Sequence, residues 1–426
     1  MNRFELRPLL AALGPGLLMA GAAIGVSHLV QATRAGADYG LTLLALVLLA
    51  CILKYPFLEF GPRYAAATGE SLIRGYKRLG DWALGLFALI TLATMFIIQA
   101  SVTLVTAGLA GLVFGLDATL TQLSFGVLIC CIVVLALGRF AALDRVMKVI
   151  ITVLAVSTTL AVILALGAAP DPALLNPLHE LDLVWTAAGI AFVLALLGWM
   201  PIPLDVAAWH SLWTLERGRQ TGMRPSVSLA LFDFRIGYLG ATITAVIFLL
   251  LGALVMHGTG DRFPTEAVAF SARLVDIYAS SLGEWSRSLI AAAALTAMFS
   301  TTLAVTDAYP RVIRAMIEVS GVASDDKSGR GLDLHRGRYV TGLLMVTIGA
   351  LIIILYFGER FTALIDVATT VSFLAAPLLA WLNIRVITAE FMPAEHRPGP
   401  GLMRLAWTGF WFLVLFCLIW LGWRLL

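Results

Sequence analysis

Apolar runs of about 20 residues recur along nearly the whole chain, and short polar connections separate them. A helix of that length matches the thickness of the hydrocarbon core of a bilayer. The pattern therefore predicts an all-α polytopic membrane protein with eleven transmembrane helices. To within about 2–4 residues, the predicted span cores are 12–33, 40–62, 84–112, 121–138, 144–167, 183–213, 236–256, 286–312, 339–357, 362–388 and 405–424.

The first and sixth spans are each interrupted near the middle. The first contains the stretch 23–28, with Gly25 and Ser27, and the sixth contains Trp199-Met200-Pro201-Ile202-Pro203. Such a break is tolerated at membrane depth only where the freed backbone faces protein or a cavity. Two breaks five spans apart are typical of inverted-repeat transporters, which bind substrate between them.

We therefore predict one transporter domain over residues 1–426. The first repeat would cover about 11–167, the second about 183–388, and an additional helix 405–424. The two breaks are expected to face each other.

The composition supports a membrane protein, since 60% of residues are hydrophobic and 13% are charged, against roughly 25% charged in soluble proteins. The lipid bilayer is thus a predicted partner and nucleic acid is not. The sequence contains no hydrolase, metalloprotease or phosphate-loop motif, so neither an enzyme activity nor a cofactor is predicted. The four cysteines lie inside apolar spans without metal-binding spacing and are interpreted as packing residues.

Lysine and arginine are distributed unequally between the two sides of the predicted topology. With a cytoplasmic N-terminus, 22 of the 29 fall on the cytoplasmic side and six outside, and the remaining one is Lys54 in the membrane. Positive residues favour the cytoplasmic side. We therefore predict a bacterial-type inner membrane protein with its N-terminus inside and its C-terminus outside.

Several motifs follow one another along the chain in a recognisable order. They are Gly14-Pro15-Gly16 opening span 1, the stretch 35–40 (AGADYG) opening span 2, Met200-Pro201 with the later His210-Ser211, the stretch 300–309 (STTLAVTDAY), and Val371-Ser372-Phe373 with Pro377. In order, spacing and span count the chain resembles the Nramp family of divalent-metal transporters from about residue 11 to 424. The resemblance implies a LeuT-type fold of five plus five helices with one extra helix, and alternating-access transport.

The resemblance also implies a metal site at the two breaks, and there the sequence departs from the family. The family's Asp-Pro-Gly-Asn aligns with Gly25, Val26, Ser27 and His28, so its carboxylate is missing. The family's two acidic residues for proton movement in span 3 align with Thr103 and Thr106.

The family also has a Met-Pro-His motif at the break of span 6, and this sequence can be aligned with it in two ways. Anchoring on Met200-Pro201 preserves the methionine and places Ile202 at the histidine. Anchoring on His210-Ser211 places Pro203 at the methionine and Asp205 at the first histidine.

Polar side chains and freed carbonyls at the breaks are the candidate substrate ligands. His28 could ligate a metal or take a proton, or it could bond a freed carbonyl of the broken helix. Asp205 lies near the start of the second half-helix, where capping of free N–H groups is favoured. The predicted substrate-binding residues are Ala23, Gly25, Ser27, His28, Met200, Pro203 and Asp205, and no metal ligand set is assigned.

Lys54 lies deep in span 2, where an unpaired ammonium is costly. It could be a fixed positive charge that replaces a coupling cation or attracts an anion, or it could pair with Asp307 or Asp366. Arg311 follows Asp307 by four residues, the spacing of a helix-surface ion pair. The predicted pathway or coupling residues are Lys54, Thr103, Thr106, His210, Asp307 and Thr369.

Three functions are compatible with this pattern. The first is transport of a divalent cation, which the resemblance implies. The second is transport of a neutral or anionic small solute, which the missing carboxylate and Lys54 favour. The third is a non-transporting membrane sensor on the same scaffold.

Overall fold

The computed structural model describes residues 14–137, 140–167, 176–222, 224–321, 331–357 and 360–425 as helices and their connections. In the first half, the helices are α2 (Pro15–Ala23), the π-helix η1 (Val26–Ala32), α3 (Thr33–Tyr39), α4 (Leu44–Thr68), α5 (Leu72–Leu79), α6 (Asp81–Phe114), α7 (Leu120–Ala136) and α8 (Phe140–Gly167). In the second half, they are α9 (Leu181–Val184), α10 (Ala187–Trp199), α11 (Val206–Thr221), α12 (Val227–Val255), α13 (Ala267–Leu282), α14 (Ser286–Val319), α15 (Gly331–Phe357), α16 (Phe361–Thr388), the 3₁₀ turn η3 (Ala394–His396) and α17 (Pro400–Leu425).

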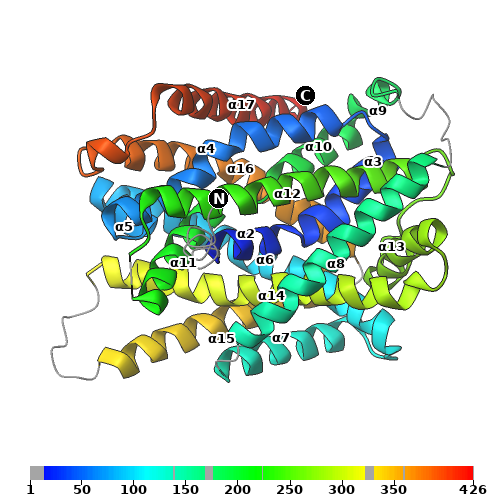
Figure 1. The fold of residues 1–426 in the computed structure, drawn as a ribbon, viewed down its shortest axis with the longest axis horizontal. Helices are drawn as coiled ribbons and strands as arrows, with labels where there is room; N and C mark the ends of the chain where they lie inside the picture. The colour runs from blue at the N-terminus through cyan, green and yellow to red at the C-terminus, as the bar shows by residue number, and fades with distance from the viewer. Residues whose placement is uncertain are drawn as a thin grey trace, which may run out of the picture.

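The long helices run side by side along the longest axis of the molecule (Figure 1). Within the described residues, eight helical segments are long and apolar enough to cross a membrane. Three shorter apolar helices accompany them, Leu120–Ala136, Thr152–Gly167 and Ala187–Trp199. The all-α prediction is confirmed, and the count of eleven stays a prediction because these three would also have to cross.

The broken first span lies at the centre of the bundle (Figure 1). Its second half ends in α3, which packs so closely on α12 that a Cβ at Gly36 would lie 1.9 Å from the carbonyl oxygen of Leu249. In return, a Cβ at Gly252 would lie 2.1 Å from the carbonyl oxygen of Thr33. Glycine is required at both positions because the two backbones touch.

The start of α2 is fixed by a buried carboxylate on α12. Asp233 accepts hydrogen bonds from the backbone N–H of Gly14 at 2.9 Å and of Gly16 at 2.6 Å. The first N–H groups of a helix have no partner within it, so Asp233 supplies both a partner and a favourable negative charge.

Helix α13 occupies a connection that the sequence pattern assigned to a polar loop. Its buried residues include Phe270, Leu274 and Tyr278, at helical spacing. The hydroxyl of Tyr278 lies 2.8 Å from that of Thr158 on α8. This amphipathic helix is too short and too polar to register as a span, which is why the pattern missed it.

Candidate functional site between two broken helices

The first span breaks where the sequence predicts. Helix α2 ends at Ala23, Ile24 and Gly25 are not helical, and η1 begins at Val26. The Ser27 hydroxyl donates to the Ala23 carbonyl at 2.5 Å, which satisfies one carbonyl that the break frees. A Cβ at Gly25 would lie 2.6 Å from Cγ2 of Thr301 on α14, so span 1 approaches α14 closely at this point.

The sixth span breaks between Trp199, the last residue of α10, and Val206, the first of α11. The peptide bond between Met200 and Pro201 is cis. The Ser27 hydroxyl oxygen lies 3.5 Å from the Pro201 carbonyl oxygen. The two predicted breaks are therefore confirmed, and they face each other.

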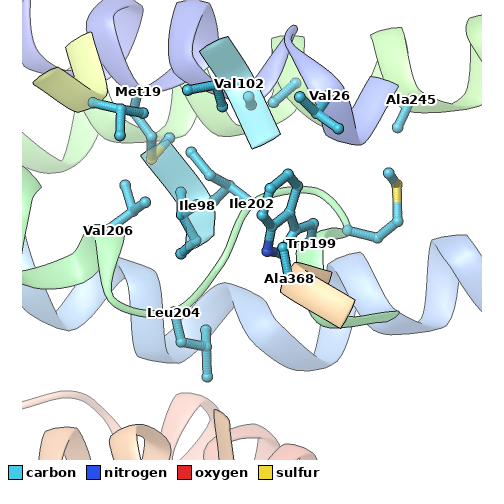
Figure 2. Close-up of a cluster of buried hydrophobic side chains, with 14 of the residues drawn as sticks. Met19, Val26, Ile98, Val102, Trp199, Ile202, Leu204, Val206, Ala245 and Ala368 are labelled. Atoms are coloured by element: carbon cyan, nitrogen blue, oxygen red, sulfur yellow. The ribbon is translucent and has the colours of Figure 1, made fainter. Parts of the chain in front are cut away.

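The gap between the breaks is small and apolar. Figure 2 shows Trp199, Ile202 and Ile98 gathered between the broken helices. A cavity of about 30 Å³ remains there, and no ionisable side chain lines it within the described part of the chain. Its lining residues are Ala22, Val26, Ser27, Ile98, Val102, Trp199, Ile202, Pro203, Val206, Trp209, Thr301 and Val305.

His28 points at α12 and is not among the residues that line this cavity. Its Nε2 donates to the Ala241 carbonyl at 2.8 Å, and its Nδ1 lies 3.0 Å from the Ser27 hydroxyl. The ring is completely buried. A ligand would have to compete with the carbonyl of Ala241 for this imidazole, and the role of His28 in substrate binding stays a prediction.

Lys54 occupies the carboxyl end of α10. Its ammonium donates to the carbonyls of Leu197 at 3.2 Å and Gly198 at 3.0 Å. The last carbonyls of a helix lack partners and form the negative end of its dipole. A side-chain cation thus sits where the broken helix offers a binding place for a cation.

The predicted ion pairs of Lys54 are wrong, because both carboxylates have other partners. Asp307 accepts from Arg311 Nε at 2.6 Å, as the four-residue spacing predicted, and from Tyr339 at 2.7 Å. Asp366 pairs with Arg34 at 2.8 Å.

Asp205 takes the N-cap position of α11, but within the described residues its side chain makes no capping hydrogen bond. Its carboxylate instead accepts from the Tyr309 hydroxyl at 3.2 Å. The side chain turns toward α14, but the carboxylate also interacts with the backbone N–H of Val206 at the start of α11, so the capping role of Asp205 stays a prediction. Of the other predicted ligands in this segment, Pro203 lines the cavity and Met200 is buried away from it.

A polar cluster joins η1 and α3 to α16 beyond the first break. Gln31 donates to Asp366 and to Thr369, each at 3.3 Å, and Arg34 donates to Gln31 Oε1 at 3.2 Å. Thr369 was predicted, whereas Gln31 and Arg34 were missed. The signal available for Arg34 was its spacing of three residues from Gln31, which places both on one helix face.

The predicted coupling threonines form a seam between α6 and α14. Gln99 Nε2 donates to Thr103 at 3.2 Å and to Thr306 at 3.0 Å. The hydroxyls of Thr106 and Thr302 lie 2.7 Å apart. None of these five side chains titrates near neutral pH, so the seam joins two helices by neutral hydrogen bonds.

His210 lies on α11, apart from the other candidates. Neither ring nitrogen has a hydrogen-bond partner among the described residues. The ring packs against Phe234, with centroids 5.7 Å apart. The structure therefore brings Ser27 and Pro203 together at the breaks and leaves His28, Lys54, Asp307 and His210 in separate surroundings.

Comparison with known proteins identifies the scaffold. Residues 16–422 match the family model described as natural resistance-associated macrophage protein-like. The chain belongs to the Nramp family. The Nramp resemblance predicted from the motifs is thereby confirmed.

The relatives of this Nramp protein extend over its whole length. It is 34% identical over 419 residues to an uncharacterized protein of Pasteurella multocida, PM0681, covering 97% of this chain and 92% of that protein. The Eremococcus coleocola manganese transporter superposes with a TM-score of 0.71 at 14% identity, over 98% of this chain and 87% of that one. The transporter MhsT in complex with L-phenylalanine gives 0.60 at 14% identity, over 96% and 97%.

These structural likenesses, at 14% identity, establish the fold. The chain has the LeuT-type architecture of a multi-pass membrane transporter, as the sequence predicted.

Proposed function

We propose that this Nramp family member is a secondary transporter that works by alternating access and binds its substrate between the breaks of α2–η1 and α10–α11. The 3.5 Å approach of Ser27 to Pro201 supports this placement, as does the rule that discontinuous helices form transporter sites. The proposal includes the two repeats, eleven spans, and a cytoplasmic N-terminus in a bacterial-type inner membrane.

The substrate class that the geometry favours is a small neutral or anionic organic solute. The observation that carries this choice is Lys54, whose ammonium already satisfies the carbonyls at the end of α10. This charge lies on the carbonyl of Gly198, the residue before the lining residue Trp199, and the lining offers no carboxylate within the described residues. Divalent cations bind in proteins where side-chain oxygen or nitrogen ligands, carboxylates above all, replace the water molecules around the ion. Apolar walls with hydroxyl groups suit an organic solute better.

Solved relatives show that the fold accommodates such ligands. MhsT was solved with L-phenylalanine, and the transporter Mhp1, with a TM-score of 0.56, was solved with bromovinylhydantoin.

A divalent transition-metal ion is the second candidate. Family membership and the manganese transporters of Eremococcus coleocola favour it. Asp205 is buried in the same non-helical break as Pro201 and could supply a carboxylate if α11 moved.

Proteoliposome uptake distinguishes the two candidates. We expect one member of a panel of amino acids, nucleobases and small carboxylic acids to be taken up, and ⁵⁴Mn²⁺ uptake to stay at the level of empty vesicles. Lys54→Met and Lys54→Gln should each lower solute uptake at low concentration at least about tenfold, because a lost buried charged contact costs roughly 2 kcal/mol or more.

The two variants separate charge from structure. Lys54→Gln keeps a donor for the carbonyls of Leu197 and Gly198, so its thermal stability serves as the folding control. Full uptake by a folded Lys54→Gln protein would show that the charge is not needed. Saturable ⁵⁴Mn²⁺ uptake with no uptake of any organic solute would establish the second candidate.

A further inference from the structure

A second cavity lies at the opposite end of span 1 from Pro15, beyond the polar cluster of Arg34. It has a volume of about 600 Å³ and is lined by residues from α3, from the connection before α9, and from the end of α12. In Figure 1 these elements meet at the right-hand end of the molecule, near the α9 label. We call this cavity the vestibule.

Three metal-ligating side chains converge on one wall of the vestibule. His179 Nδ1 lies 2.9 Å from Oε1 of Glu180, and His257 Nε2 lies 3.4 Å from the same oxygen. One ligand atom of each residue lies within 4.8 Å of the other two. The described residues hold no other such group of histidine, cysteine and carboxylate side chains.

Two of the three residues make hydrogen bonds to groups outside the cluster. His257 Nδ1 donates to the Ala37 carbonyl at 3.1 Å, which leaves the Nε2 lone pair directed toward Glu180. The backbone N–H of Glu180 donates to the Thr42 hydroxyl at 3.3 Å. The His257 side chain is 8% exposed and the His179 side chain is 45% exposed. One side of the cluster is therefore buried and ordered, and the other is open to an entering ion.

We propose that His179, Glu180 and His257 bind a divalent transition-metal ion of the Zn²⁺ class. Two imidazoles and one carboxylate are a ligand set that zinc accepts in tetrahedral geometry, with the fourth position left to water. Nitrogen ligands favour such an ion over Mg²⁺ or Ca²⁺. The two imidazole nitrogens lie 2.9 and 3.4 Å from the Glu180 carboxylate, close to the roughly 3.4 Å between two ligands about 2.1 Å from a tetrahedral ion.

A bound ion would tie the connection before α9 to the end of α12, which itself packs on α3. His179 and Glu180 precede α9, His257 follows α12, and Ala37 belongs to α3. The site is separate from the gap between the breaks and requires neither candidate substrate.

Calorimetry with ZnCl₂ on detergent-purified full-length protein without a polyhistidine tag tests the site. We expect one equivalent to bind and CoCl₂ to give the visible absorption of a four- or five-coordinate ion. His179→Ala, Glu180→Gln and His257→Ala should each weaken Zn²⁺ binding at least about tenfold, the lower limit for a perturbed metal site. His396→Ala, in the η3 turn, is the matched control and should bind as the wild type does.

The exposed His179 keeps the test independent of folding, since its removal opens no cavity in the core. Zn²⁺ binding that is unchanged in folded His179→Ala and in the double variant with His257→Ala overturns the proposal, as does the absence of binding by the wild type. Because binding is measured without transport, failure of the transport proposal leaves this result unaffected.

Discussion

Individual residues at the breaks decide what the central gap can bind. The sequence motifs predict that Gly25 takes the place of the family's carboxylate, and a Cβ built on Gly25 points at Thr301. A side chain here would meet Cγ2 of Thr301 at 2.6 Å and its hydroxyl at 2.7 Å. A carboxylate at position 25 would therefore collide with α14.

Restoring the carboxylate should thus require two changes. Gly25→Asp alone should destabilise the protein by about 1–3 kcal/mol through overpacking, and Gly25→Asp with Thr301→Ala should recover most of that loss. In a His257→Ala background, which removes the vestibule site, the pair combined with His28→Asn should bind Mn²⁺ more tightly than the parent. Thermal unfolding and calorimetry measure both effects. Equal stability of Gly25→Asp and wild type would contradict the steric argument.

The threonine seam gives a prediction about coupling. Gln99, Thr103, Thr106, Thr302 and Thr306 bond one another without an ionisable group. Thr103→Val with Thr106→Val should therefore leave transport-linked proton flux unchanged, although each lost hydrogen bond should cost about 1 kcal/mol of stability. Proteoliposomes with an internal pH dye test this, and proton flux abolished by the double variant would refute it.

At the scale of elements, the close contact of α3 with α12 limits which residues can replace the glycines between them. Gly252→Ala would place a methyl group 2.1 Å from the Thr33 carbonyl oxygen. We expect a large fall in folded yield or in thermal midpoint, because two backbones would have to separate. Gly240→Ala, on the same helix with nothing within 4 Å of the added Cβ, is the control and should be neutral or slightly stabilising. Matching effects of the two substitutions would disprove the contact.

The anchor of α2 should be equally measurable. Asp233→Ala removes the acceptor for the N–H groups of Gly14 and Gly16. Hydrogen bonds to a charged group are worth about 1.5–3 kcal/mol each, so we expect a loss of at least 1.5–3 kcal/mol, measured by thermal unfolding in detergent. A change of a few tenths of a kcal/mol would mean that α2 is held elsewhere.

The elements could be predicted to different degrees, for physical reasons. The breaks were predictable because Gly25, Pro201 and Pro203 interrupt runs that otherwise suit a bilayer. The partners of Lys54 were not, because they are backbone carbonyls 143 and 144 residues away along the chain. The cluster of His179 and His257 was missed because the two residues lie in polar connections far apart along the chain, and only the docking of the connection before α9 near Thr42 and the end of α12 brings them together.

At the scale of the whole molecule, charge asymmetry orients the bundle. The vestibule end should face outward and the end with α5 and η3 should face the cytoplasm. In a variant whose native cysteines are replaced, Asn176→Cys should react with a membrane-impermeant maleimide added outside intact cells. Glu395→Cys should react only after the membrane is opened. Reversed labelling would overturn the proposed orientation.

The ammonium on α4 has an energetic consequence for the transport cycle. A cation bound from solution can be released on the other side, and its gradient then drives the substrate uphill. Lys54 is covalently attached to the chain and stays with its helix through every turnover, so no metal or sodium gradient can do work at this position. If the protein accumulates a solute, a coupling ion has to bind at another place, or the driving force has to come from the membrane potential acting on the solute or from the solute's own removal inside the cell.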